Sequence, residues 1–198
     1  MIAAEEEVLR ANAYALLAAL LTAPPSADLL QALAVLDGGV DAEEGPMGAA
    51  FATLATAARA ADPADAADEY GALFIGVGGG ELSPYGSYYK TGFLNEKPLA
   101  ELRADMARLG IARADDVREP EDHIAALCEM MAGLITGAFD AEASLDEQHA
   151  FFERHVAGWA ERFFTDLEAA QSARFYRAVG ALGRTFFAVE RQAFDLAA

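Results

Sequence analysis

The sequence predicts an all-α protein, a bundle of about eight or more helices. Nearly every long segment repeats its apolar residues at helical spacing, so that they fall on one stripe of an amphipathic helix. No segment alternates apolar and polar residues as a half-buried strand does. Apolar residues make up 54% of the 198 positions, which is enough to fill a sizeable core.

Helices follow one another along the first half of the chain. Pro24-Pro25 stops the N-terminal helix, and Ser26 can cap the next one. A third helix ends before Pro63, because a residue that precedes proline disfavours the α region. The helices expected here cover about 9–21, 26–37, 47–61, 64–75 and 98–110.

A glycine-rich segment interrupts this pattern. The run from Gly76 to Gly80 cannot hold a helix, because glycine loses too much backbone freedom there. We expect one loop over 76–92, after which Pro98 suits the first turn of a helix that closes at Gly110.

The second half is predicted to be helical as well. Pro120 opens a buried helix that runs to about Phe139, because proline is tolerated in a first turn. Ser144 and Glu147 form a capping-box pattern, which starts a helix rich in aromatic residues. A final helix covers about 170–195.

Composition also divides the chain into two expected portions. The N-terminal portion covers 1–110 and includes the 76–92 loop, and the C-terminal portion covers 118–198. A polar link over 111–117 joins them. A hinge of this kind would permit a domain-swapped homodimer.

The charge balance excludes several kinds of partner. The chain has 14 basic and 32 acidic residues, a net charge of −18. Nucleic acid needs a basic face, and an anionic membrane surface needs a basic patch, so neither is an expected partner. A basic peptide is a compatible partner.

The remaining composition points to the cytoplasm. Cys128 is the one cysteine, so no intramolecular disulfide forms, which fits a reducing compartment. The acidic N-terminus lacks the basic start of a secretory signal. The apolar run from Ala11 to Ala23 is shorter than the roughly 20 residues of a membrane helix, so we expect no membrane insertion.

Residue patterns of common active and cofactor sites do not occur. The glycine run is followed by Glu81-Leu82, where a P-loop needs Gly-Lys-Ser/Thr. Neither Cys-x-x-Cys nor His-Glu-x-x-His is present, and Ser87 does not lie in a Gly-x-Ser-x-Gly elbow. Cys128 lies among apolar residues, where a cysteine is usually an inert part of the core. We therefore predict no cofactor, no metal and no catalytic residue.

Two short segments carry polar and aromatic groups that a helical bundle does not need. Glu119 to His123 places acidic residues and an imidazole at a helix start, where histidine commonly bonds a carbonyl or carboxylate across an interface. Pro84 to Tyr89 contains three tyrosines, which suit a recognition surface. A well-made helix start and aromatics that cover a core edge are the structural alternatives.

Together these segments resemble the TorD/DmsD family of redox-enzyme maturation chaperones, relatives of the NarJ group. The family pattern is Leu-Phe-x-Gly, a proline-aromatic-x-Ser-x-aromatic loop, and Glu-Pro-x-Asp-His. It reads here as Leu73-Phe74-Ile75-Gly76, Pro84-Tyr85-Gly86-Ser87-Tyr88-Tyr89 and Glu119-Pro120-Glu121-Asp122-His123, with Gln148, Phe152, His155, Trp159 and Phe175-Tyr176 agreeing later in the chain.

The resemblance implies a TorD-like fold and a function. Such proteins are cytoplasmic chaperones that bind the twin-arginine signal peptide of a molybdenum-cofactor oxidoreductase. They hold the apoprotein until its cofactor is inserted, before export. Peptide binding would then fall, by this resemblance and the acidity of the second segment, to Leu73, Phe74, Pro84, Tyr85, Ser87, Tyr88, Glu119, Asp122 and His123.

Our interpretation is that these residues frame an apolar cleft, with Glu119, Glu121 and Asp122 attracting the basic end of the peptide. Three alternatives stay open on the sequence alone. One is a helical enzyme that uses His123 and a nearby acid. The others are a small-ligand or nucleotide-binding module and a structural assembly subunit.

Overall fold

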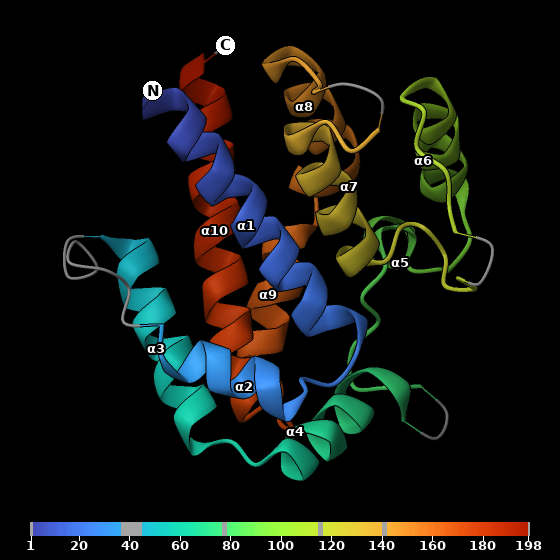
Figure 1. The fold of residues 1–198 in the computed structure, drawn as a ribbon. Coiled ribbons are helices and arrows are strands. Elements are labelled where there is room, and N and C mark those ends of the chain that lie inside the picture. The colour runs from blue at the N-terminus through green and yellow to red at the C-terminus, as the bar shows by residue number, and fades with distance from the viewer. Residues whose placement is uncertain (1, 37–44, 77–78, 115–116, 140–141, 198) are drawn as a thin grey trace. The chain divides into compact units, whose positions relative to one another are not determined.

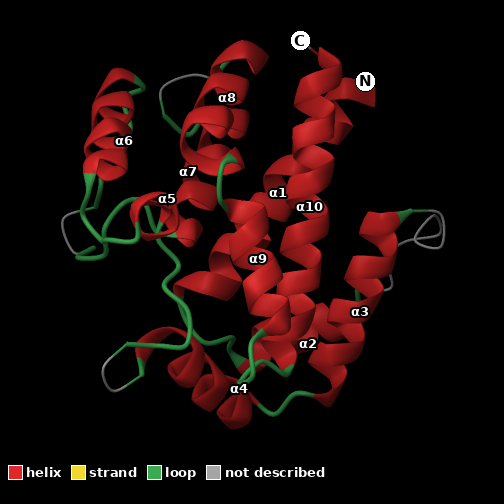
Figure 2. Cartoon of the chain, turned by 180° about the vertical axis from the view of Figure 1, so that it is seen from behind, coloured by secondary structure: helices red, strands yellow, loops and turns green. Residues whose placement is uncertain are grey.

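The computed structural model describes residues 2–36, 45–76, 79–114, 117–139 and 142–197. Within these ranges the chain forms ten α-helices and two short π-helical segments, and no β-strand beyond one isolated bridge (Figures 1 and 2). The prediction of an all-α fold with eight or more helices is confirmed. No helix in these ranges is both long and apolar enough to cross a membrane.

The helices are divided between two units that interleave along the chain. Unit 1 comprises Met1–Thr22 and Pro84–Ala160, and unit 2 comprises Ala23–Ser83 and Glu161–Ala198. The expected link at 111–117, of which 115–116 lie outside the described residues, therefore falls inside unit 1. Each unit joins helices that are distant in sequence, because their apolar faces are buried against one another.

Unit 1 is centred on two helices that pack along each other. Both α1 (Ile2–Thr22) and α7 (Ile124–Thr136) contribute apolar side chains to its core, among them Tyr14, Leu17 and Met131. The other elements of this unit are α5 (Gly86–Thr91), α6 (Lys97–Arg108), α8 (Leu145–Phe152) and the π-helical segment η2 (Glu153–Ala157).

Unit 2 is built around its longest helix, α10 (Phe175–Ala197), which packs on α3 (Pro46–Ala60) and α4 (Pro63–Tyr70). A Cβ at Gly183 would lie 2.1 Å from the Phe164 ring, so glycine permits the close approach of α9 (Ala160–Ala169). The unit also contains α2 (Ala27–Ala34) and the π-helical segment η1 (Gly71–Ile75).

Several helix boundaries predicted from the sequence are wrong. The 76–92 loop contains helix α5, and the helix expected to open at Pro120 begins at Ile124, with His123 as its N-cap. The long aromatic helix after Ser144 is broken by η2, although its capping box is confirmed. The starts of α5 and α7 are set by hydrogen bonds between residues 84–87 and residues 122–124. The residue pattern within either segment alone does not show these hydrogen bonds.

Candidate functional site

The two segments that the sequence singled out in unit 1 are joined directly. An isolated antiparallel bridge pairs Tyr85 with His123. The Gly86 amide donates to the Asp122 carbonyl at 2.9 Å, and the Ile124 amide donates to the Pro84 carbonyl at 2.9 Å. We call the group of Tyr85, Ser87, Tyr88, Glu119, Asp122 and His123 the bridge cluster.

Three side chains of the bridge cluster, those of Tyr85, Glu119 and His123, meet at this pairing. The rings of Tyr85 and His123 are T-shaped, with centroids 5.2 Å apart. The Tyr85 hydroxyl donates to the carboxylate of Glu119, which is exposed. Because the two residues form the pair between flanking hydrogen bonds, their side chains lie close together. A half-buried phenol, an exposed carboxylate and an imidazole are therefore held side by side.

His123 is fixed in one tautomer. Its Nδ1 accepts the Ala125 amide at 3.1 Å, which caps α7. Burial lowers the pKa of His123 to about 4, so the ring is neutral at pH 7. The proton of a neutral ring whose Nδ1 accepts must be on Nε2, which leaves Nε2–H as a donor. The ring is 9% exposed.

Asp122 serves the local fold. Its Oδ2 accepts the Ser87 amide at 2.7 Å, which satisfies a donor in the first turn of α5. The side chain is 3% exposed. Asp122 and His123 bond different partners and not each other, so they do not form a catalytic dyad.

Glu121 is buried and already paired within the chain. Arg103 donates to it at 3.0 and 2.8 Å, and Arg113 lies 3.7 Å away. Burial is the largest single influence and raises the pKa of the Glu121 carboxyl, but the hydrogen bond from Arg103, a backbone hydrogen bond and the charges of Arg103 and Arg113 together hold the pKa below its ordinary value. Of the three acidic residues expected to attract a basic peptide, Glu119 alone is exposed.

Aromatic side chains continue the surface beyond the bridge. Tyr88 is 44% exposed and packs edge-on against Tyr89, which in turn lies against Trp159. The indole of Trp159 also backs the turn, since a Cβ at Gly86 would lie 3.1 Å from its Nε1. Sequence reasoning noted Trp159 through the family resemblance and did not assign it this role.

Leu73 and Phe74 belong to unit 2, where Leu73 lies in the interior and Phe74 is partly exposed. Leu73 is fully buried, and Phe74 packs against Tyr70 at 5.0 Å and Tyr176 at 5.6 Å. The nine predicted site residues are therefore shared between the two units. Leu73 offers no surface to a peptide, and the peptide-binding role of this pair stays a prediction.

The glycine-rich segment supports this interior. The Leu82 amide donates to the Leu73 carbonyl at 2.9 Å. A Cβ at Gly80 would lie 2.4 Å from the same carbonyl oxygen, so glycine lets the chain fold back onto η1.

Pro84, another of the nine predicted site residues, is buried in unit 1. Its carbonyl accepts one of the two hydrogen bonds that flank the Tyr85–His123 bridge.

The sequence reasoning missed two polar networks that hold the units. In unit 1, Asp105 is bonded by His155 Nε2 and by Arg154, both at 2.8 Å. In unit 2, the Glu69 carboxylate accepts the amides of Arg174, Phe175 and Tyr176 at the start of α10. The hydrogen-bonded residues of these networks are 49 to 107 positions apart in the sequence, so no local residue pattern shows the networks.

The described residues contain neither a group of side chains that could hold a metal nor an accessible thiol. No group of three or more His, Cys, Asp and Glu side chains that could hold a metal occurs among them. Cys128 is buried, and burial raises the pKa of its thiol far above the ordinary value, which keeps it protonated.

Comparisons with known proteins identify relatives. The family model described as nitrate reductase delta subunit matches residues 41–165, more than half of the chain. A chaperone protein TorD of Vibrio atlanticus is 29% identical over 133 residues, which is 63% of this chain and 57% of that protein. TorD of Photobacterium profundum is 30% identical over 118 residues, 56% and 55% of the two chains. The chain thus spans little more than half the length of the curated relatives it matches.

A crystal structure from Archaeoglobus fulgidus shares the fold. That protein, provisionally described as a redox enzyme maturation protein, aligns with a TM-score of 0.60 over 90% of this chain and 93% of its own, at 21% identity.

Proposed function

This chain belongs to the nitrate reductase delta subunit family and is similar to TorD chaperones, and on that premise we propose that it is a maturation chaperone and not an enzyme. It binds the twin-arginine signal peptide of a molybdenum-cofactor oxidoreductase in the cytoplasm. It holds the apoprotein while the cofactor is inserted, before export, and carries no cofactor itself.

The Tyr85–His123 bridge is the observation that carries this proposal. It holds an exposed carboxylate, a phenol ring and a fixed Nε2–H donor within one small surface of unit 1. A twin-arginine signal offers two arginines followed by an apolar stretch. Glu119 attracts an arginine, Tyr85 and Tyr88 cover apolar side chains, and His123 donates to a peptide carbonyl.

The remaining predicted residues have supporting parts in this proposal. Asp122 fixes the Ser87 amide, and Pro84 supplies its carbonyl to the bridge, so these three hold the turn that presents Tyr85 and Tyr88. Leu73 and Phe74 stabilise unit 2. The homodimer through the 111–117 hinge stays a prediction.

Magnitudes decide which contacts dominate. An exposed arginine–carboxylate pair contributes about 0–1 kcal/mol. Burial of one Leu, Val or Phe side chain contributes about 1.5–3 kcal/mol. Ordering the peptide costs about 2–5 kcal/mol. Apolar contacts therefore supply most of the affinity, and we expect a Kd of about 1 μM, or about −8 kcal/mol.

Calorimetric titration against a panel of leader peptides tests the function. Twin-arginine leaders of molybdenum-cofactor oxidoreductases should bind at about micromolar Kd. Matched leaders from secreted proteins without the twin arginines should bind weakly. If no twin-arginine leader in the panel gives heat of binding, the proposal is wrong.

A further inference from the structure

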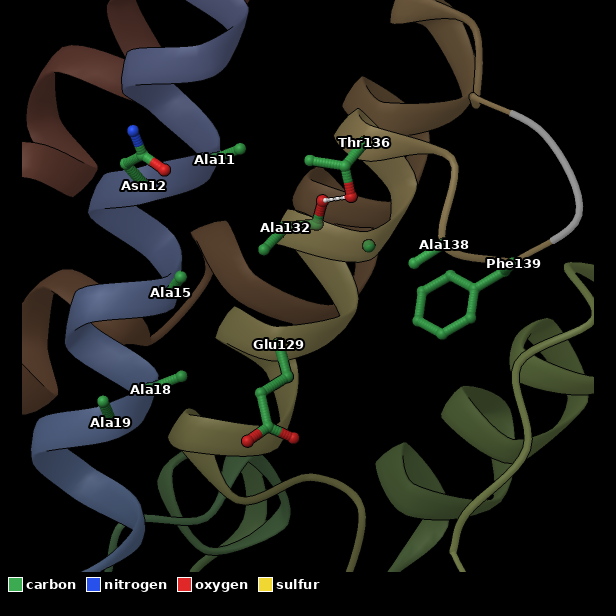
Figure 3. Close-up of a pocket in the computed structure, with 11 residues that line it drawn as sticks. Ala11, Asn12, Ala15, Ala18, Ala19, Glu129, Ala132, Thr136, Ala138 and Phe139 are labelled. Carbon is green, nitrogen blue, oxygen red and sulfur yellow. Dashed lines mark hydrogen bonds between the residues drawn. The ribbon is translucent and has the colours of Figure 1, made fainter.

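A groove in unit 1 lies between α1 and α7 (Figure 3), and its described lining residues include none of the bridge cluster. Its volume is about 460 Å³, within the usual range for a ligand site of about 300–1,000 Å³. Small side chains form its walls: Ala11, Ala15, Ala18 and Ala19 on α1, with Ala132 and Gly133 on α7. The groove exists because these positions carry little or no side chain.

Ala138 and Phe139, which follow α7, also line the groove. A Cβ at Gly133 would lie 2.2 Å from the Phe139 ring, so the ring occupies the space that a larger residue would fill. Thr136 lines the groove as well, and its hydroxyl donates to the Ala132 carbonyl at 2.8 Å (Figure 3). The hydroxyl is thus satisfied within α7.

The α1 side of the groove is uncharged although it is open to solvent. Residues 11–22 contain no Asp, Glu, Lys or Arg, in a chain of which 23% is charged. Ala15 and Ala19 are exposed, and so is Val8, about two turns nearer the N-terminus on the same side of the helix, with the exposed Asn12 between them. A solvent-facing helix side normally carries charged residues. This exposed side of α1 carries small and apolar residues and one amide, that of Asn12, but no charge, which makes it a candidate interaction surface.

One carboxylate, that of Glu129, lies among the groove's described lining residues. Figure 3 shows it at the end beside Ala18 and Ala19. The Glu129 side chain is exposed, yet neighbouring atoms exclude enough water to raise the pKa of its carboxyl above the ordinary value. A cation at this end would stabilise the charged form.

We propose that this groove seats the apolar segment of the client's signal peptide as a short helix, with a basic residue at the start of that segment beside Glu129. The inference rests on the proposed function. Ala11 to Ala19 spans about 12 Å of α1, room for about two helical turns. A helix laid on small residues can approach closely and bury apolar side chains.

Charge favours this occupant over a second copy of the chain. Each copy has a net charge of −18, so two copies repel. A leader segment that is apolar and basic at its start complements both the uncharged walls and Glu129.

The groove and the bridge cluster can be reached by one peptide. Glu129 lies six residues after His123, about 9 Å further along the axis and about 120° around the helix. A peptide that passes around the start of α7 needs about six extended residues to connect them. The arginines of a leader and the apolar side chains next to them would then lie at the bridge cluster, and the rest of its apolar segment in the groove.

Filling the groove tests the inference. Ala15→Leu/Ala19→Leu places two large side chains at exposed α1 positions, where the fold tolerates them. Ala49→Leu/Ala52→Leu, at exposed α3 positions in unit 2, is the matched control. We expect a labelled full-length leader to bind the filled variant about tenfold more weakly or worse, since at least one apolar contact is lost. The control should bind as the wild type does.

A leader truncated before its apolar segment separates the two proposals. It should bind the wild type and the filled variant equally. If the full-length leader also binds both equally, the groove inference is wrong while the proposed function stands. If the wild type binds no leader, both are wrong. If the wild type dimerises and filling abolishes the dimer without changing leader affinity, the occupant is a second copy, and the inference is overturned.

Cross-linking locates the segment independently. Cys128 is buried and its thiol stays protonated, so a photoreactive label attaches selectively to Ala15→Cys. That label should cross-link to the apolar segment of the leader, whereas a label on Ala52→Cys should not. Cross-links from Ala15→Cys to the basic end alone would overturn the inference.

Discussion

Two regions of the molecule share one family pattern and differ in how much of it they expose. The bridge cluster of unit 1 exposes Glu119 and Tyr88 around a fixed imidazole. In unit 2 Leu73 is fully buried, and Phe74 is partly exposed and packs against Tyr70 and Tyr176. The comparison teaches that residues of one family pattern differ in exposure, and that a fully buried side chain such as Leu73 cannot meet a partner directly.

Leu73→Ala should give the largest effect and test the interior assignment. Truncation of a fully buried leucine costs about 2–5 kcal/mol of unfolding free energy, because it loses apolar burial and leaves a cavity. Urea unfolding followed by circular dichroism measures it. Ile75→Ala, two residues on and exposed, is the control and should change stability by less than about 0.5 kcal/mol. Equal losses in both variants would contradict the assignment.

A pH series on His123 tests the imidazole of the bridge cluster. Its pKa is about 4 when folded against 6.5 ordinarily, so between these values the unfolded chain binds a proton that the folded chain does not. Stability from this group is complete above pH 6.5 and is lost as the pH falls toward 4.

The comparison variant is His123→Asn, which keeps a cap acceptor and does not titrate. From pH 7 to 4.5 the wild type should lose about 2–3 kcal/mol more unfolding free energy than this variant. Parallel pH curves from urea unfolding would show that the ring is not held neutral by burial.

Two carboxylates in the bridge cluster form a matched pair. Asp122→Ala should cost about 1–3 kcal/mol of unfolding free energy, because the buried Ser87 amide loses its partner. Glu119→Ala should leave stability almost unchanged and slow leader association instead, because the residue is exposed. Thermal melts and stopped-flow association measure the two effects. If Glu119→Ala lost as much unfolding free energy as Asp122→Ala, Glu119 would have a structural role as well, and the assignment of Glu119 to peptide recognition alone would be wrong.

Salt should have the smallest effect. Raising sodium chloride from about 50 to 300 mM shortens the screening length and should slow leader association, while the affinity falls by less than about tenfold. This follows if apolar contacts supply most of the binding. An affinity loss of several orders of magnitude would assign the binding to charge.

Local patterns predicted the parts of the fold that depend on neighbouring residues. The capping box of Ser144 and Glu147 is an example, because its two hydrogen bonds lie within one turn. The helical class follows from apolar spacing in the same way. The starts of α5 and α7 depend instead on Asp122 meeting Ser87, a contact between residues 35 apart.

The sequence predicted which residues belong to the candidate site, but not how their side chains are arranged. The resemblance placed Tyr85 and His123 in one set, and the structure pairs them. It did not distinguish Glu119 from Glu121, because the arginine partners that bury Glu121 come from other parts of the chain. The groove along α1 was also missed, since an alanine-rich apolar run does not show which of its residues face solvent.

Titration of one twin-arginine leader into the wild type and into Tyr85→Ala/Tyr88→Ala tests the central claim most directly. We predict a Kd of about 1 μM for the wild type and a loss of about tenfold or more for the double variant, with unfolding free energies within about 1 kcal/mol of each other. Unchanged affinity in a folded double variant would contradict the claim that the bridge cluster holds the signal peptide.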